Sequence, residues 1–328
     1  MPIPETASAF LAGHVDRLRQ IKPKKRIVFP EGTDPRVLAA AARLANDGLV
    51  EPILIGPAPL TGAPAGVRFV EAGAKYASVY YERRRAKGIT HMEAENIASL
   101  PLFYAALMVG AGDADGYVGG AANTTAETVR AALHCIGTQP NVKTVSSVLF
   151  MAVPDPAFGH NGIFAFADCA IVIDPTSLEL AEIAIATAQS VRALMNVEPH
   201  IALLSFSTKA SAKHPLIDKV AEALRIVHER APELNVDGEL QVDAALMAAV
   251  GQSKAPGSTV AGRANTLIFP DLGAGNIGYK LVERLAHGAA YGPILQGLAK
   301  PANDLSRGCS AEDIYSVAII TALQSCFH

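Results

Sequence analysis

RIVFPEGTDPRVLAAAARLAND, residues 26–47, contains a strand, a loop and a helix in succession. The β-branched and aromatic run at its start predicts a buried strand, and the apolar residues that follow recur with the period of a helix. Asp34 is placed to cap that helix, and proline is favoured where Pro35 stands. The segment therefore predicts one βα unit with a polar loop at the carboxyl end of its strand.

Similar strand-like runs alternate with helical segments along the rest of the chain. They are EPILIG at 51–56, GYV at 116–118, TVSSVLF at 144–150, CAIVI at 169–173, IALLSF at 201–206 and TLIFP at 266–270. Further helices are predicted to begin at or beside Ser177 and at Pro215. This alternation is typical of α/β proteins with parallel sheets covered on both faces. A length of 328 residues suits two such domains at ~150 residues each.

Composition narrows the class of protein. No apolar stretch approaches the ~20 residues that span a bilayer. The first residues lack the basic segment of a secretory signal, and the four cysteines are scattered without metal-binding spacing. A net charge of −3 gives no overall attraction to nucleic acid. We therefore expect a cytoplasmic protein that binds neither membranes nor nucleic acid.

Four polar, glycine-rich segments each follow a predicted strand and precede a helix. They occupy residues 30–34, 119–125, 205–209 and 270–278. In parallel sheets such loops share the carboxyl edge, where ligands bind. Helix N-termini at that edge offer unpaired N–H groups and a positive dipole end, which suit phosphate. The sequence therefore predicts a phosphate-bearing ligand.

GAGNIG at 273–278 matches the dinucleotide-binding pattern G-x-G-x-x-G. Only 50 residues follow it, too few for the rest of a nucleotide-binding half, and the acidic residue expected ~20 positions later is absent near Leu298–Lys300. Both observations disfavour a nicotinamide-dependent dehydrogenase.

The densest polar segment is KPANDLSRGCSAEDI at 300–314, ahead of an apolar helix. Ser310 and Asp313 have the spacing of a capping box, and Arg307 alone could be a surface charge. From these residues alone, helix capping is favoured over catalysis.

Six segments together resemble the phosphate acetyltransferase (phosphotransacetylase) family. They are VFPEGTDPRVL, GITHMEA, DADGYVGG, SFSTKASAKHP, LIFPDLGAGNIGYKLVERL and GPILQGLAKPANDLSRGCSAEDI. They cover nearly the whole chain, and the run from Leu267 to Ile314 is the most specific. The related phosphate butyryltransferases share the architecture, so butyryl transfer is the alternative to acetyl transfer.

The resemblance implies two α/β/α domains with largely parallel sheets, like isocitrate and isopropylmalate dehydrogenases, with the active site in the interdomain cleft. It places the first domain at 1–145 plus 299–328 and the second at 146–298, and it implies a homodimer. The stretch from Gly56 to Tyr76 is shorter than is usual in the family, so a helix and a strand at the first domain's edge are expected to be trimmed.

The implied reaction is reversible acetyl transfer between acetyl phosphate and coenzyme A, with coenzyme A as substrate, no bound cofactor and no metal. Carried over by residue, Ser306 and Arg307 are catalytic and Asp313 is the general base. The substrate-binding residues implied are Arg84, Arg130, Arg36, Arg284, Thr124, Thr125, Ser207 and Thr208.

Acyl transfer to a thiol needs a thiolate, because the thiol is a poor nucleophile. Moving a proton from a thiol of pKa about 8.5 to an aspartate of about 3.9 costs roughly 6 kcal/mol. We therefore expect Asp313 to be buried, which would raise its pKa, and Arg307 to stabilise developing negative charge. Acylation of Cys309 is an alternative, although no histidine lies near it in sequence.

Two other classes stay open. A metal-dependent decarboxylating dehydrogenase would need a cluster of aspartates, for which Asp271, Asp304 and Asp313 are poorly spaced. A non-catalytic sensor of coenzyme A or acyl phosphate would not need Ser306, Arg307 and Asp313 together.

Overall fold

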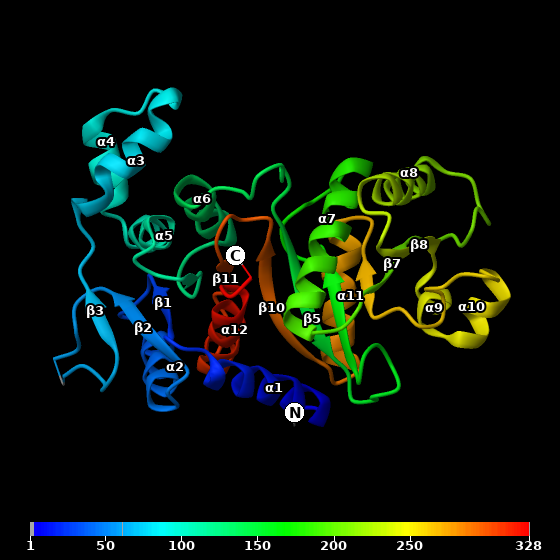
Figure 1. Ribbon diagram of the computed structural model, residues 1–328, viewed down its shortest axis with the longest axis horizontal. Helices are drawn as coiled ribbons and strands as arrows, with labels where there is room; N and C mark the ends of the chain where they lie inside the picture. Colours follow the sequence, from blue (N-terminus) through cyan, green and yellow to red (C-terminus); the bar gives the residue numbers. More distant parts are fainter. Residues whose placement is uncertain (1–2, 61, 328) are drawn as a thin grey trace. The chain divides into compact units, whose positions relative to one another are not determined.

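The computed structural model describes residues 3–60 and 62–327, and the chain divides into two compact units (Figure 1). Unit 1 comprises Met1–Ala12 and Val142–Gly297, and unit 2 comprises Gly13–Asn141 and Leu298–His328. Residues 3–12 thus group with the later segment, whereas the family resemblance implies that they belong to the first domain. Helix α1 (Glu5–Gln20) contributes residues to both.

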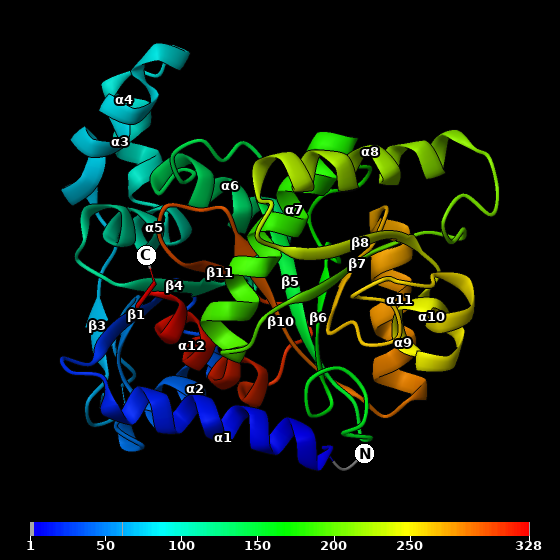
Figure 2. The same cartoon turned by 45° about the vertical axis from the view of Figure 1, so that its right-hand side comes forward.

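Unit 2 is built on a five-stranded parallel sheet in the order β11-β4-β1-β2-β3. Its strands are β1 (Lys25–Phe29), β2 (Val50–Ile55), β3 (Arg68–Val70), β4 (Gly116–Gly119) and β11 (Ala302–Asp304). Helices α2 (Pro35–Asn46) and α12 (Ala311–Gln324) pack together on one face, and α5 (Pro101–Ala111) and α6 (Thr125–Cys135) cover the other (Figure 2). The short elements η1 (Ala74–Tyr76), α3 (Ala77–Arg84), η2 (Arg85–Lys87) and α4 (His91–Ala98) complete it.

The βα unit predicted at residues 26–47 is confirmed. Ile27, Val28 and Phe29 are fully buried because the sheet is covered on both faces. The side chain of Asp34 accepts a hydrogen bond from the N–H of Arg36 and so caps α2. The helix buries residues on one side at helical spacing, against the sheet and α12.

Unit 1 is built on a six-stranded sheet in the order β10-β5-β6-β9-β7-β8. Its strands are β5 (Ser146–Ala152), β6 (Ile163–Ala167), β7 (His200–Leu204), β8 (Asn235–Leu240), β9 (Thr266–Ile268) and β10 (Ala289–Gln296). The β10–β5 and β5–β6 pairs are antiparallel and the others parallel. Its helices are α7 (Ser177–Ser190), η3 (Val191–Met195), α8 (Pro215–Arg230), α9 (Val242–Leu246), α10 (Ala248–Lys254) and α11 (Leu272–Leu285).

The predicted α/β fold with mostly parallel sheets is confirmed, but the strand predicted at 169–173 is wrong. The carboxylate of buried Asp168 accepts hydrogen bonds from the N–H groups of Ala170, Ile171 and Val172 and from the Ser147 hydroxyl. These N–H groups therefore cannot join a strand ladder. The strand at this place in the sheet is β6, just upstream.

Between Gly56 and Tyr76 the described residues form β3 and η1 but no α-helix. Within residues 3–60 and 62–327, no single helix is long and apolar enough to cross a membrane. The pair α4 and α5 passes that test together, with a 95° bend between them.

A buried acidic cluster lies beneath the loops at the carboxyl edge of the unit 2 sheet. Three of its polar atoms are buried without a hydrogen-bond partner among the described residues: Glu31 Oε2, the Tyr117 hydroxyl and Asp304 Oδ1. The other Asp304 oxygen accepts a 2.6 Å hydrogen bond from Thr125. Burial raises the pKa of Asp304 from 3.8 to about 6, and the nearby Glu31 carboxylate adds to the shift.

This raised pKa predicts that Asp304→Asn stabilises the protein at high pH. The folded state holds the Asp304 proton more tightly, so its stability falls as pH rises from about 4 through about 6, by on the order of 3 kcal/mol. An amide carries no charge to desolvate. We expect thermal unfolding of the variant to shift up by several degrees at pH 8 and little at pH 4.

Asp113→Asn is the control of opposite sign, because a hydrogen bond from Lys75 lowers the pKa of Asp113. That variant should lose stability at pH 8. A lower unfolding temperature for Asp304→Asn at both pH values would show that the buried charge does not destabilise the fold.

Candidate active site

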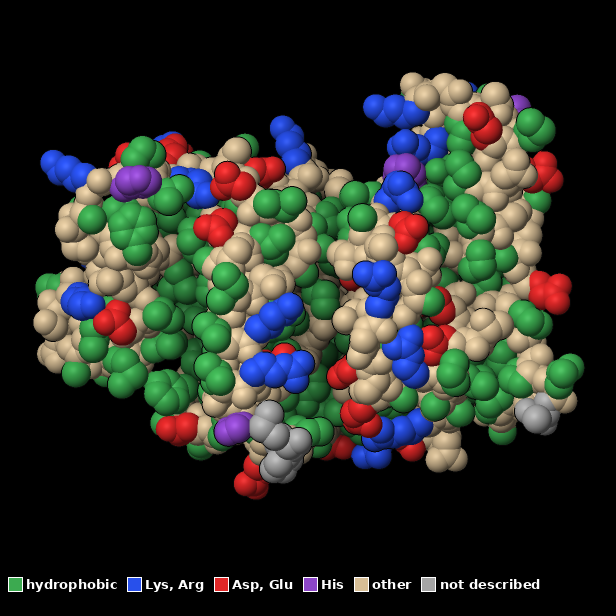
Figure 3. Space-filling view, turned by 180° about the vertical axis from the view of Figure 1, so that it is seen from behind, with side chains coloured by type: hydrophobic (Ala, Val, Ile, Leu, Met, Phe, Trp, Pro, Cys, Tyr) green, Lys and Arg blue, Asp and Glu red, His purple; other side chains and the backbone are tan. Residues whose placement is uncertain are grey.

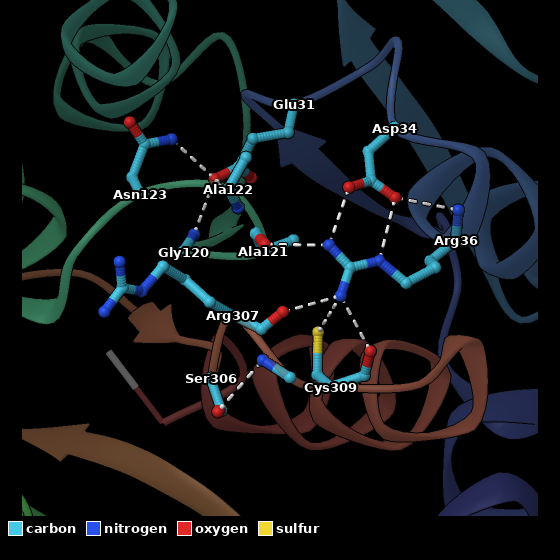
Figure 4. A network of polar contacts seen from close by, with 11 residues as sticks. Glu31, Asp34, Arg36, Gly120, Ala121, Ala122, Asn123, Ser306, Arg307 and Cys309 are labelled. Atoms are coloured by element: carbon cyan, nitrogen blue, oxygen red, sulfur yellow. Dashed lines mark hydrogen bonds and ion pairs between the residues drawn. The ribbon is translucent and has the colours of Figure 1, made fainter.

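Three loops meet at the carboxyl edge of the unit 2 sheet, where β1, β4 and β11 end. One oxygen of Glu31, after β1, accepts hydrogen bonds from Gly120 N at 2.9 Å, Ala122 N at 3.3 Å and Asn123 Nδ2 at 2.8 Å (Figure 4). Glu31 thereby holds the β4–α6 loop against the β1–α2 loop. The predicted shared edge for segments 30–34 and 119–125 is confirmed within this unit.

Arg36 joins the third loop to the other two. Its Nη1 donates to the carbonyl oxygens of Arg307 at 2.8 Å and Cys309 at 2.9 Å. Its Nη2 donates to Ala121 O at 2.8 Å and to Asp34 Oδ2 at 2.7 Å, and its Nε donates to Asp34 Oδ1 at 3.1 Å. A guanidinium has five N–H donors, so every donor of Arg36 is directed at a protein acceptor.

Arg307 is the opposite case. Its backbone is held by Arg36, but its guanidinium makes no hydrogen bond or ion pair with any residue in the described part of the chain (Figure 4). The pKa of Glu127 is lowered chiefly by hydrogen bonds from Thr124, and the positive charges of Arg130 and Arg307 contribute. The unpaired Arg307 guanidinium therefore lies within electrostatic range of the first turn of α6.

Ser306 precedes this arginine in the β11–α12 loop, and Asp313 follows it in the first turn of α12. Ser306 is exposed, and its hydroxyl oxygen accepts a 3.2 Å hydrogen bond from Gly308 N. Asp313 closes a capping box: its Oδ2 accepts from Ser310 N and the Ser310 hydroxyl at 2.8 and 2.9 Å. The capping interpretation is confirmed, and it leaves Asp313 Oδ1 without a hydrogen bond to any described residue.

The expected burial of Asp313 is wrong, because its side chain is exposed. The first turn of α12 faces solvent, and burial begins at Ile314, where the helix turns its apolar residues to the core.

Helices α3 and α6 bring together a basic group that includes Arg84 and Arg130. Burial lowers the pKa of His134, and the charges of Arg84 and Arg130 lower it further. The His134 Nδ1 lies 3.1 Å from the Tyr80 hydroxyl. Positions 127, 130 and 134 share one face of α6. The basic group therefore lies on the same helix face as Glu127, which is in the first turn of α6, close to Arg307. Basic side chains gather around a histidine over this region in the space-filling view (Figure 3).

A hollow of about 510 Å³ in unit 2 lies beside these residues. One wall is apolar, from Leu100 to Phe103 at the N-terminus of α5. Glu31, Asn123 and Arg130 contribute polar walls. The hollow is therefore lined for a ligand with both apolar and charged parts.

The two predicted threonines of the β4–α6 loop are already engaged. Thr124 caps α6 in a capping box with Glu127. Thr125 donates to Asp304. Both side chains stabilise the loop in this state.

The remaining predicted residues lie in unit 1. The Ser207 hydroxyl donates to Glu239 at 2.8 Å, and the Thr208 hydroxyl lies 3.3 Å from Gln241 Oε1. Arg284, near the end of α11, is exposed and lies 3.5 Å from Glu283. Ser207 and Thr208 lie in the loop after β7, and Arg284 lies on α11.

The G-x-G-x-x-G run at 273–278 lies inside α11, whose N-cap is Asp271. A side chain at Gly275 would collide with the Asp168 carbonyl, so this glycine permits close packing of the helix. The run is thus not the strand-to-helix turn of a dinucleotide site.

The remaining candidate reactive groups are the thiol of Cys309 and the carboxylates of Asp271, Asp304 and Asp313. Burial raises the pKa of the Cys309 thiol to about 11, which opposes thiolate formation. Asp304 is buried in the acidic cluster, Asp313 caps α12 and Asp271 caps α11. Within residues 3–60 and 62–327, no three His, Cys, Asp or Glu side chains are grouped to hold a metal ion.

Glu31, Asp34, Glu127 and His134 were not predicted as site residues. The signal for the first two was present, since charged residues in a loop between a buried strand and a helix are placed at the ligand edge. Glu127 and His134 were identifiable only from their spacing from Arg130 on one helix face.

Comparison with known proteins identifies the family. A model of the phosphate acetyl/butaryl transferase family matches residues 14–322. A phosphate acetyltransferase of Acetivibrio thermocellus is 49% identical over 312 residues, covering 92% of this chain and 94% of that protein. One from Clostridium acetobutylicum is 47% identical over 315 residues, covering 92% and 95%. A solved phosphotransacetylase structure from Streptococcus pyogenes has a TM-score of 0.91 at 44% identity, covering 98% of this chain and 99% of that one. The chain therefore belongs to the phosphate acetyl/butaryl transferase family.

Proposed function

We propose that this chain is a phosphate acetyltransferase that moves acetyl groups reversibly between acetyl phosphate and coenzyme A. The observation that carries the proposal is the unpaired guanidinium of Arg307, presented on a clamped backbone between Ser306 and the capped start of α12. Relatives that share nearly half of its residues are named for this activity.

The proposed chemistry is direct transfer. The coenzyme A thiol gives its proton to Asp313 Oδ1, the oxygen that the capping box leaves unused. The thiolate attacks the acetyl carbon of acetyl phosphate, the bond from that carbon to the phosphate oxygen breaks, and phosphate leaves. Arg307 stabilises the negative charge on the reacting oxygens, and Ser306 donates a hydrogen bond to the same region.

Proton transfer to an exposed carboxylate is uphill, so the proposal requires substrate to change the surroundings of Asp313. Bound coenzyme A would cover the first turn of α12 and remove water from the carboxylate. Arg307 lowers the pKa of the thiol at the same time, because its positive charge favours the thiolate. A buried Cys309 thiol with a pKa of about 11 offers no competing nucleophile.

Coenzyme A binding is assigned to the basic group on α3 and α6. Arg84 and Arg130 provide the charge for its phosphates, and the neighbouring apolar wall at Leu100–Phe103 suits its uncharged arm. The loop hydroxyls of Thr124 and Thr125 are proposed to bind substrate. A substrate-binding role for Ser207 and Thr208 stays a prediction of the family resemblance. No bound cofactor or metal is part of this proposal.

We also propose a homodimer, supported by an apolar stripe on α11. Ile277, Leu281 and Leu285 recur every four residues, and each is at least half exposed. Large exposed apolar side chains in such a row are typical of an interface. Arg284 lies on the same face of the helix, so a dimer contact there would cover its side chain. We therefore leave Arg284 out of the proposed substrate site.

Asp313→Asn and Ser310→Ala separate catalysis from capping. Both variants weaken the capping box, but only the first removes the carboxylate. We expect Asp313→Asn to lower kcat for acetyl-coenzyme A formation by at least ~10²-fold, as for loss of a general base. Ser310→Ala should keep most of the turnover and lower the unfolding temperature, since a lost cap costs ~1 kcal/mol.

Turnover is measured from acetyl phosphate and coenzyme A, beside propionyl and butyryl phosphate, with acetyl phosphate expected to be the best substrate. Equal turnover in wild type and Asp313→Asn would reduce Asp313 to a helix cap. Absence of transfer in the wild type, with coenzyme A still bound, would favour a sensor.

Leu281→Glu tests the dimer. A carboxylate in the centre of the apolar stripe should dissociate the protein, because it would be buried without a partner. Leu216→Glu, on the exposed side of α8, is the matched control. Sedimentation velocity should give a dimer for the wild type and the control and a monomer for Leu281→Glu. A monomeric wild type, or a dimeric Leu281→Glu, would contradict the proposal.

A further inference from the structure

The family resemblance implies that Arg36 binds substrate, but its hydrogen bonds are unlike those of an arginine that is free to bind phosphate. An anion-binding arginine usually offers two parallel N–H donors to one ligand. All five donors of Arg36 are directed at protein oxygens, at distances between 2.7 and 3.1 Å. A substrate phosphate could bind here only after at least two of these bonds break.

The acceptors of Arg36 come from three separate loops. Asp34 belongs to the loop after β1, Ala121 to the loop after β4, and Arg307 and Cys309 to the loop after β11 (Figure 4). The two carbonyls of the third loop lie on either side of Gly308. Arg36 therefore restrains the backbone of the segment that carries Ser306 and the unpaired guanidinium of Arg307.

We propose that Arg36 is a positioning residue, which fixes the backbone of Arg307 and does not bind substrate. This role goes beyond the proposed function and rests on it for the reaction that is measured. The hydrogen bonds of Arg36 fix the backbone position from which the Arg307 side chain projects. A displacement of about 1 Å at a reacting group can cost ~10² in rate.

Asp34 completes the arrangement. Both oxygens of Asp34 accept hydrogen bonds from the Arg36 guanidinium. The pKa of Asp34 is lowered chiefly by this side-chain hydrogen bonding. The pair leaves little net positive charge at Arg36 to compete for anionic substrate. Arg307, which has no such carboxylate partner among the described residues, keeps its charge for the transition state.

The rest of the β11–α12 loop is held by few other bonds. Leu305 N donates to Gly119 O at 2.7 Å and Cys309 N donates to Ser306 O at 2.9 Å. Neither bond reaches the carbonyls of Arg307 or Cys309. Removal of Arg36 would leave those two oxygens without their donor, and the loop would be free to shift.

The test compares Arg36→Ala, Arg36→Lys and Asp34→Asn in steady-state acetyl transfer. For a positioning residue, each variant should lower kcat, by about 10²-fold for Arg36→Ala. KM values for acetyl phosphate and coenzyme A should stay within about threefold of the wild type. Lysine should not restore the rate, because its single ammonium cannot join three loops. Guanidinium chloride, well below denaturing concentrations, should partly restore Arg36→Ala by refilling the vacant position.

A substrate-binding role predicts different results. Arg36→Ala would then raise KM at least tenfold, lysine would preserve much of the binding, and Asp34→Asn would tighten binding by releasing the guanidinium. Any of these three outcomes would overturn the proposal. Arg130→Ala serves as the binding control, since it should raise the KM for coenzyme A.

Direct binding keeps this test separate from that of the proposed function. Calorimetric titration with coenzyme A needs no turnover, and Arg36→Ala should bind it as tightly as the wild type does. If the wild type lacks acetyl transfer, the proposed function fails while this titration still reports on Arg36. Affinity lost in Arg36→Ala, with an unchanged unfolding temperature, would contradict the positioning role.

Discussion

The hydrogen bonds between one guanidinium and three loops are the constraint on which the rest of the candidate site depends. Loops at the carboxyl edge of a parallel sheet carry carbonyl groups that no strand ladder satisfies. Arg36 supplies donors to three such carbonyls and is itself neutralised by Asp34. The edge is therefore held in one arrangement without using the guanidinium of Arg307. One arginine is used entirely for structure, so that another stays available for chemistry.

A second constraint lies below these loops. Glu31 and Asp304 bring two carboxylates into a buried cluster with the Tyr117 hydroxyl, and each keeps an atom without a partner among the described residues. Glu31 uses its other oxygen to hold the β4–α6 loop, and Asp304 uses its other oxygen to bind Thr125. The loops are thus fixed by buried acids at a cost in stability. Such a cost is common where a protein fixes polar groups for function.

Much of the fold follows from the sequence, because strand and helix periods are local properties. The βα unit at 26–47 and the cap at Asp34 are confirmed by the structure. The strand predicted at 169–173 fails because Asp168, a residue just outside the run, takes the N–H groups that a ladder would need. Periodicity shows which residues are apolar, but it does not show where their backbone hydrogen bonds go.

The candidate site is less predictable, because its geometry depends on residues far apart in the chain. The sequence marks Arg307, Ser306 and Asp313 as one segment, and family resemblance gives them roles. The bonding of Arg36 depends on partners at 121, 307 and 309, so no local pattern separates a positioning arginine from a binding one. Asp313 shows a different limit: its spacing predicts the capping box correctly, yet its exposure depends on where α12 meets the core.

The most direct test of whether Arg36 acts by positioning Arg307 is a double-mutant cycle, in which kcat is measured for Arg36→Ala, Arg307→Ala and the double variant. If Arg36 acts through Arg307, removing Arg307 leaves Arg36 nothing to position, and the double variant should be about as slow as Arg307→Ala alone. Effects that multiply in the double variant would show that the two arginines act independently. That result would contradict the claim that the clamp around Arg36 exists to hold Arg307.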